Sequence, residues 1–472
     1  MNADAILQLS AAELARAIRA KKTTALAAMQ AVLARADAVQ QPLNCFIHID
    51  HDNALHAARL ADSDFARGHL RGPLHGVPMA HKDMYYRQGV ASSCGSKIKR
   101  DIPAPSTATA LQRLDAAGAI QFGVLNMAEF AYGPTGHNYH FGHCRNPWDV
   151  TRITGGSSSG SGSAVAALAS FAALGSDTGG SIRAPATFCG VSGIKPTWSR
   201  VSRHGAMPLS FSMDTVGPLA RSVEDCALIL GVIAGADAAD PTASTETVPD
   251  YVGRLTRAQI KGLRIGRPKN FFYDDMDAEI GALMQSSLDA FAKLGAQIVD
   301  VQLPDMNPWN YAGMMVIAAE AAAAHANWLR NCPQDYSEQV RARLELGLSV
   351  PAVTYLESLR LRGVAVEQFS RAVFDHVDLL HTPSVCFQTP TIDETDVGGS
   401  TNMSHALNNI TRLTRPINYL GLPSLSVPAG FTKQGLPTAM QLIGRPFDEA
   451  TLFVAGHAYQ QTTDWHRRHP TL

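Results

Sequence analysis

Hydrophobic and polar residues recur along this chain with the two periods that distinguish helices from strands. Ser10 and Glu13 have the spacing of a capping box, and helical spacing follows over residues 11–20. Further helical patterns occupy later segments: residues 24–37, 107–119, 163–170 and 277–294. Strand patterns occupy the end of 72–86 and the apolar stretches 120–127, 171–177, 263–272, 296–304, 377–385 and 422–431.

The alternation of strands with helices predicts an α/β fold around a central sheet. A polar, loop-like stretch covers residues 237–255, and residues 310–376 are mostly helical and lack a glycine-rich motif. Because core-like strands occur on both sides of this helical block, we expect a single domain over residues 1–472. The region of about residues 240–375 is expected to be a more variable, partly helical cap inserted into that domain.

Composition narrows the class of protein. The 472 residues are 46% hydrophobic and 17% charged, as in a globular protein, and the formal net charge of -1 provides no basic field for nucleic acid. The seven cysteines are scattered without a CxxC pair, which favours reduced thiols. The N-terminus lacks a signal-peptide pattern, and no apolar stretch reaches the ~20 residues that span a bilayer. We therefore expect a cytoplasmic protein that binds neither nucleic acid nor membrane.

The glycine- and serine-rich stretch at residues 155–163 admits several interpretations. A Walker loop would end in a lysine that is absent here, and Val165 stands where a dinucleotide-binding fingerprint has its last glycine. Gly156, Ser158 and Gly160 match a G-x-S-x-G nucleophile elbow, but the residues before them make a poor strand. A flexible linker fits the composition, but not the compact α/β context.

The stretch GSDTGGSIRAPA, residues 175–186, suggests acyl-transfer chemistry. Consecutive glycines allow neighbouring backbone N–H groups to converge on one point. Such donors would stabilise a developing oxyanion, and a serine beside them could attack the same carbonyl group. The amides concerned are those of Thr178, Gly179, Gly180 and Ser181.

A nucleophilic serine needs a base. The chain has 17 histidines, and spacing selects none of them. Lys82 lies in the apolar segment GVPMAHKDMYY, where burial would lower its pKa, and a neutral amine can accept a hydroxyl proton. The competing interpretation is a structural lysine that pairs with Asp83 or another carboxylate.

Three blocks of the chain resemble the signature blocks of the amidase signature family of serine hydrolases, in the same order. They are GVPMAHKD, GGSSSGS and GSDTGGSIRAPA. The resemblance implies a Ser-cisSer-Lys triad, with Ser181 as nucleophile, Ser157 as the bridging serine whose peptide bond is cis, and Lys82 as base. It also implies the family's fold, a central mixed sheet with helices on both faces, and no cofactor.

The resemblance leaves two functions open. The first is a free-standing amidase, a monomer or homodimer that cleaves small apolar or aryl amides through an acyl-Ser181 intermediate, with carbamates (urethanes) or esters as further substrates. The second is the A subunit of a glutamine-dependent tRNA amidotransferase, a partner-dependent glutaminase. Two departures favour the first: the tyrosine-rich segment of the A subunit is absent from residues 349–373, and Thr411 or a neighbour replaces an expected acidic residue.

Side chains near the signature blocks extend the prediction. Apolar residues, Met127 and Phe130 among them, predict an apolar substrate pocket. The segment HNYHFGHC, residues 137–144, resembles a metal cluster, but a loop does not place this spacing on one face, so we expect no metal. Asp177 and Arg183 flank the nucleophile and are expected to form a structural ion pair.

Overall fold

A single mixed sheet runs through the molecule. The computed structural model describes residues 1–256, 259–400 and 403–472. Within them, 11 strands pair in the order β1-β3-β2-β4-β6-β5-β10-β11-β9-β7-β8. The strands are β1 (Phe46–Ile49), β2 (Pro78–Lys82), β3 (Ile120–Leu125), β4 (Ala172–Asp177), β5 (Ser192–Lys195), β6 (Thr215–Ala220), β7 (Arg264–Pro268), β8 (Gln297–Val301), β9 (Leu379–Pro383), β10 (Ser424–Phe431) and β11 (Pro437–Gly444).

Strand directions follow the lengths of the connections. β2 runs parallel to β3 and β4, and β7 runs parallel to β8 and β9, each across a connection long enough to hold a helix. The strands between these two parallel groups pair antiparallel. The predicted strands are all present, but β1, β5, β6 and β11 were not predicted. β5, β6 and β11 contain glycine or proline, which are turn signals, and each is held as a strand by neighbours on either side.

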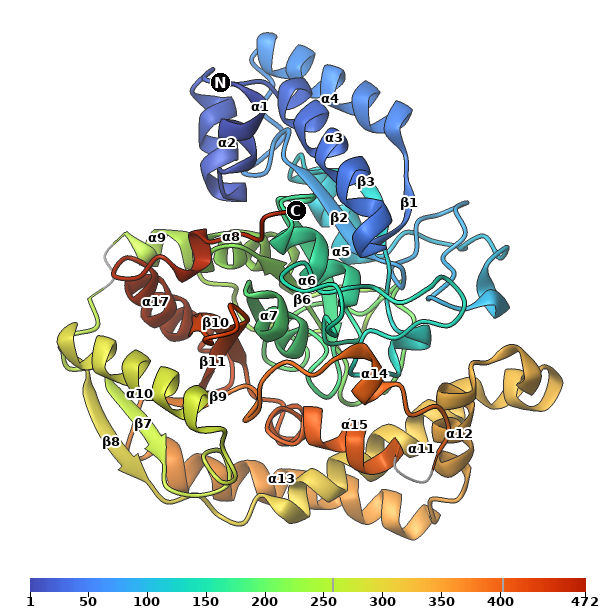
Figure 1. Ribbon diagram of the computed structural model, residues 1–472, viewed down its shortest axis with the longest axis vertical. Helices are drawn as coiled ribbons and strands as arrows, with labels where there is room; N and C mark the ends of the chain where they lie inside the picture. Colours follow the sequence, from blue (N-terminus) through green and yellow to red (C-terminus); the bar gives the residue numbers. More distant parts are fainter. Residues whose placement is uncertain (257–258, 401–402) are drawn as a thin grey trace.

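Helices surround the sheet (Figure 1). In chain order they are α1 (Ala3–Leu7), α2 (Ala11–Arg19), α3 (Ala25–Leu43), α4 (His51–Ala66), α5 (Thr109–Ala116), α6 (Ser159–Ala166), α7 (Arg183–Cys189), α8 (Val223–Ile233), α9 (Tyr251–Leu255), α10 (Ala278–Lys293), α11 (Asn307–Asn331), α12 (Glu338–Leu348), α13 (Ala352–Phe374), α14 (Ile392–Thr395), α15 (Met403–Thr411), α16 (Arg415–Tyr419) and α17 (Glu449–Gln460). Among the helices described, none is both long and apolar enough to cross a bilayer.

Local signals explain some helix boundaries and tertiary packing explains others. At α2 the predicted capping box is formed: the Ser10 amide donates to Glu13 Oε2 at 2.8 Å, and Ser10 Oγ accepts from the Glu13 amide. By contrast, α6 begins at Ser159, earlier than predicted, and contains serines and glycines that disfavour a helix in isolation. A Cβ on Gly160 would lie 2.3 Å from the Cys45 carbonyl oxygen, so close packing requires this composition.

Strand β10 shows that helices cover both faces of the sheet. Its Leu425 and Val427 side chains lie beside Gly456 of α17. The intervening Ser426 pairs with Gly193 of β5, which lies against Ala186 of α7. Because alternate residues of a strand point to opposite faces, α7 and α17 lie on opposite faces. This arrangement confirms the predicted α/β class, a mixed sheet flanked by helices.

The region predicted to be a cap contributes to two parts of the molecule. Its long helices α11, α12 and α13 lie at the end opposite the N-terminal helices (Figure 1). The same region also supplies β7 and β8 of the main sheet. The division into a single domain over residues 1–472 with an inserted cap stays a prediction.

Candidate active site

Lys82 lies in the interior at the end of a central strand. It is the last residue of β2, whose neighbours β3 and β4 run parallel to it, so the carboxyl ends of β2 and β4 meet at one edge. Its side chain is fully buried, and Nζ lies 2.7 Å from Ser157 Oγ and 2.8 Å from Ser176 Oγ. The amine therefore contacts hydroxyl groups, and the competing interpretation of an ion pair with Asp83 does not describe it.

The surroundings of Lys82 lower its proton affinity. Burial lowers the pKa of Lys82 to about 7, because the ammonium form loses its hydration. The carboxyl groups of Asp214 and Asp177 act in the opposite direction but do not compensate. Near neutral pH a large share of this amine is uncharged and can accept a proton from a hydroxyl group.

Ser157 lies in a turn that only glycine allows. The Gly156–Ser157 peptide bond is cis, and Gly155 has φ of +73°. A Cβ on Gly156 would lie 2.4 Å from the Gly133 carbonyl oxygen, which leaves no room for a side chain. The glycines of GGSSS therefore bring the Ser157 hydroxyl to Lys82. The cis bond lies at the position that the resemblance implied.

The loop that carries Ser181 is organised around Asp177. Its carboxylate pairs with the Arg183 guanidinium at 3.0 Å, with both side chains fully buried, as expected from the sequence. The same carboxylate accepts from the amides of Gly180 at 2.8 Å and Ile182 at 3.1 Å. Burial alone would raise the pKa of Asp177, but Arg183 and other neighbouring donors lower it to about 2. The carboxylate therefore stays charged and holds the loop from inside.

The predicted oxyanion donors divide into two groups. The Gly180 amide already donates to Asp177, and its φ is +138°. Among the described residues, the amides of Thr178, Gly179 and Ser181 have no hydrogen-bond acceptor. Gly179 and Ser181 are also partly exposed. These amides are free to bind an oxyanion. The proposed oxyanion site therefore has fewer donors than the sequence suggested, because the Gly180 amide is already occupied.

Two further groups adjoin this loop. Thr178 Oγ1 donates to Asp214 Oδ1 at 2.5 Å, and burial raises the pKa of Asp214 to about 6. Ser176, the second contact of Lys82, was missed in the sequence analysis. Its place near the end of a strand parallel to β2 was the available signal, but the pairing of β2 with β4 is not readable from one sequence.

Met127 and Phe130, the predicted substrate contacts, are both buried. Phe130 stacks on Trp328 with ring centroids 5.4 Å apart and packs edge-on against His325. Both side chains therefore belong to the core, and their role in substrate binding stays a prediction. Met207, another apolar residue near the signature blocks, lines a cavity of about 240 Å³ that reaches Ser176.

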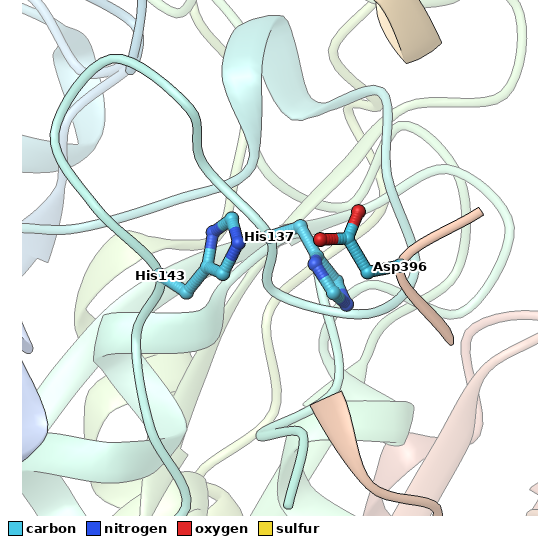
Figure 2. A group of neighbouring side chains, drawn as sticks. All are labelled: His137, His143 and Asp396. Carbon is cyan, nitrogen blue, oxygen red and sulfur yellow. The ribbon is translucent and has the colours of Figure 1, made fainter. Parts of the chain in front are cut away.

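The histidine-rich segment forms a small cluster with Asp396 (Figure 2). The ligand atoms of His137, His143 and Asp396 lie within 4.8 Å of one another. His143 Nδ1 already lies 3.1 Å from the Asn138 carbonyl oxygen, and the Tyr139 hydroxyl donates to Asp396. The fold brings Asp396 next to His137 and His143. The spacing of the histidines in the sequence did not indicate this cluster. The absence of a bound metal stays a prediction.

Solved structures of known proteins share this fold. One belongs to a vestigial protein complex that reveals the evolutionary origins of an s-triazine catabolic enzyme; it is 36% identical, with a TM-score of 0.89 over 96% of this chain and 98% of that one. Another is a peptide amidase from Stenotrophomonas maltophilia, 30% identical, with a TM-score of 0.85 over 98% of each chain.

Relatives of known function correct the functional prediction. The A subunit of the glutamyl-tRNA(Gln) amidotransferase of Moorella thermoacetica is 39% identical over 98% of both chains, and relatives from other bacteria carry the same name. These relatives contradict the expected free-standing amidase of apolar amides, carbamates or esters. They equally contradict the expected monomer or homodimer that acts on a small molecule without nucleic acid.

The reason for the error is physical. The departures at Thr411 and residues 349–373 concern short segments, whereas the similarity to the A subunits extends over nearly the whole chain. Over most of the chain, at residues 27–453, the sequence matches the family model described as Amidase. With the shared signature blocks and fold, this match shows that the chain belongs to the amidase signature family.

Proposed function

We propose that this chain is the amide-hydrolysing component of a glutamine-dependent amidotransferase that acts on an aminoacyl-tRNA. The observation that carries the chemistry is the buried contact of 2.7 Å between Lys82 Nζ and Ser157 Oγ, beside the loop of Ser181. The names of the relatives support glutamine dependence and the tRNA-linked acceptor.

In this proposal protons move along a short relay. Ser181 loses its hydroxyl proton to Ser157 as its oxygen attacks the carboxamide carbon, and Ser157 passes its own proton to the neutral Lys82 amine. The relay then runs in reverse and protonates the leaving nitrogen, so the C–N bond breaks and ammonia departs. An acyl-Ser181 ester remains. Water attacks this ester by the same relay and releases glutamate, which regenerates all three side chains.

The loop amides stabilise the charge that develops during the attack. The carbonyl oxygen becomes an oxyanion, which the free amides of Gly179 and Ser181 bind. Asp177 holds the loop in this conformation by occupying the neighbouring Gly180 amide. Loss of one such donor costs ~3–4 kcal/mol of transition-state stabilisation in related chemistry.

A partner is part of the proposal. The formal net charge of -1 is a poor basis for binding a polyanionic tRNA, since such binding rests on excess Lys and Arg. We therefore assign tRNA binding to a partner protein, to which this chain supplies ammonia. The seven cysteines are free and six are buried, which together with a tRNA-linked reaction supports a cytoplasmic location.

The experiment measures glutamate and ammonia formed from glutamine. The chain is assayed alone and with the other amidotransferase subunits of its source organism, and Ser181→Ala serves as the blank. The complete enzyme is expected to hydrolyse glutamine faster than the chain alone and to amidate glutamyl-tRNA(Gln). Release that stays at the level of Ser181→Ala in both preparations would refute the proposal.

A further inference from the structure

Arg415 begins α16 and lies against the loop that carries Ser181. The preceding Thr414 anchors it there, because its Oγ1 donates to the Gly179 carbonyl at 2.6 Å and its own carbonyl accepts from Arg183. A Cβ placed on Gly179 would lie 3.9 Å from Arg415 Cγ. The stem of Arg415 therefore lies beside Gly179, one of the proposed oxyanion donors.

The guanidinium of Arg415 has only neutral partners. The side chain is 6% exposed, and it donates to Asn310 Oδ1 and Asn408 Oδ1 at 3.0 Å each, and to Thr411 Oγ1. No described carboxylate lies within 4.0 Å of it, and the undescribed residues and side chains, 257–258, 401–402 and 404–406, include no Asp or Glu.

The two other fully buried arginines among the described residues, Arg183 and Arg200, are paired. Arg183 pairs with Asp177 at 3.0 Å, and Arg200 Nε lies 3.4 Å from a Glu449 carboxylate oxygen. Pairing is the rule because an uncompensated buried charge is costly. An unpaired guanidinium beside a catalytic loop therefore points to an anion that is absent from the free protein.

A second arginine adds to the positive charge. Arg343 of α12 donates to the Tyr132 carbonyl at 2.9 Å and stacks on the Tyr132 ring, 3.8 Å from its centroid. It too has no carboxylate within 4.0 Å among the described residues. Burial lowers the pKa of Arg415 to about 10, and the positive charge of the neighbouring Arg343 contributes to this shift. At neutral pH both guanidinium groups therefore keep their positive charge.

These groups adjoin a space that can hold a small molecule. A cavity of about 490 Å³ is lined by Tyr132, Arg343 and Asn408, the last of which is bonded to Arg415. Apolar side chains of α11 complete its wall, namely Met314, Met315 and Ala318. A ligand here would meet the positive charge of Arg343 and lie beside Asn408, the hydrogen-bond partner of Arg415.

We propose that Arg415 and Arg343 form a carboxylate-binding subsite, so that the amides cleaved at Ser181 carry a carboxylate. The inference rests on the proposed catalytic role of Ser181 and narrows its substrate class. An amino acid such as glutamine satisfies it, because a short chain joins its carboxylate to its carboxamide. Thr411 contributes by holding Arg415 through its hydroxyl.

The test compares two amides that differ in the charge at one end and by one methyl group. Succinamate carries a carboxylate, and its methyl ester does not. Calorimetry measures their binding to the full-length Ser181→Ala protein. Succinamate is expected to bind about 10- to 100-fold more tightly than the ester, the usual contribution of charge-assisted hydrogen bonds. When Arg415→Met is introduced into the Ser181→Ala protein, the preference should disappear, because only succinamate binding becomes weaker.

Controls separate a local effect from a folding defect. Arg341→Met, an exposed position on α12, should leave the preference unchanged. If Arg415→Met unfolds, Arg343→Met on a different helix gives the same test and should reduce the preference. Equal binding of the two amides to the parent protein, or a preference that survives both substitutions, would overturn the inference.

The outcome is distinguishable from failure of the proposed function. If glutamine yields no ammonia while the preference for succinamate persists and depends on Arg415, the glutaminase proposal fails and the carboxylate subsite stands. If the two amides bind equally, the subsite fails even if glutamine is hydrolysed.

Discussion

At the residue scale, the chemistry depends on one buried amine. Lys82 is held between two hydroxyl groups, at 2.7 and 2.8 Å, and no other base contacts Ser157 in the described part of the chain. Lys82→Ala is expected to reduce the rate of amide hydrolysis by ~10²–10⁴-fold, the usual contribution of general acid–base catalysis. Ammonia release by the complete enzyme measures the effect. Lys97→Ala, at an exposed position, is the control. A variant of Lys82 that keeps a tenth of the activity would exclude this role.

The pH dependence of the reaction belongs to the same residue. Since burial lowers the pKa of Lys82 to about 7, the amine is protonated and inactive below that pH and deprotonated above it. The value of kcat/KM is therefore expected to rise with pH around 7. In Asp214→Asn the midpoint should move to lower pH, because the Asp214 carboxylate favours the ammonium form. A profile that is flat from pH 5 to 9 would be inconsistent with a lysine base.

At the scale of elements, strand β4 and helix α7 are joined by an ion pair. Asp177 ends β4 and Arg183 begins α7, and neither side chain is exposed. Arg183→Met is expected to destabilise the protein by about 3–5 kcal/mol, because it leaves a buried carboxylate without its partner. Denaturant unfolding measures the change. Arg371→Met, which breaks an exposed pair on α13, should leave the unfolding midpoint unchanged. Equal effects of the two substitutions would contradict this account.

At the scale of the whole molecule, the fold shields its thiols. Six of the seven cysteines are buried, and Cys332 alone is partly exposed. Burial raises the pKa of Cys94 and Cys144 to about 12, which further suppresses the reactive thiolate. A chromogenic thiol reagent is expected to titrate about one thiol in the native protein and all seven in denaturant. Cys332→Ser should remove the native signal, and reaction of several thiols before unfolding would show that the core opens readily.

The sequence by itself determined the periodic elements, the class of fold and the signature blocks. Capping boxes and glycine-rich turns are local, so Ser10 and the Ser181 loop could be singled out without coordinates, and the resemblance to the signature blocks then pointed to Lys82 and Ser157. Close packing also restricts which residues the sequence can hold. Glycine is required at position 156, because no larger residue fits there.

Only the tertiary structure decided which groups meet. Ser176 reaches Lys82 because β2 pairs with β4, and Arg415 reaches the Ser181 loop from more than 200 residues away along the chain. Of the apolar residues near the signature blocks, the fold buries Met127 and Phe130 and places Met207 at a cavity that reaches Ser176. The hydrophobicity of a side chain indicates that it is buried away from water in the folded protein. It does not report whether that side chain packs in the core or faces a substrate, because this distinction depends on contacts between segments that are distant in sequence.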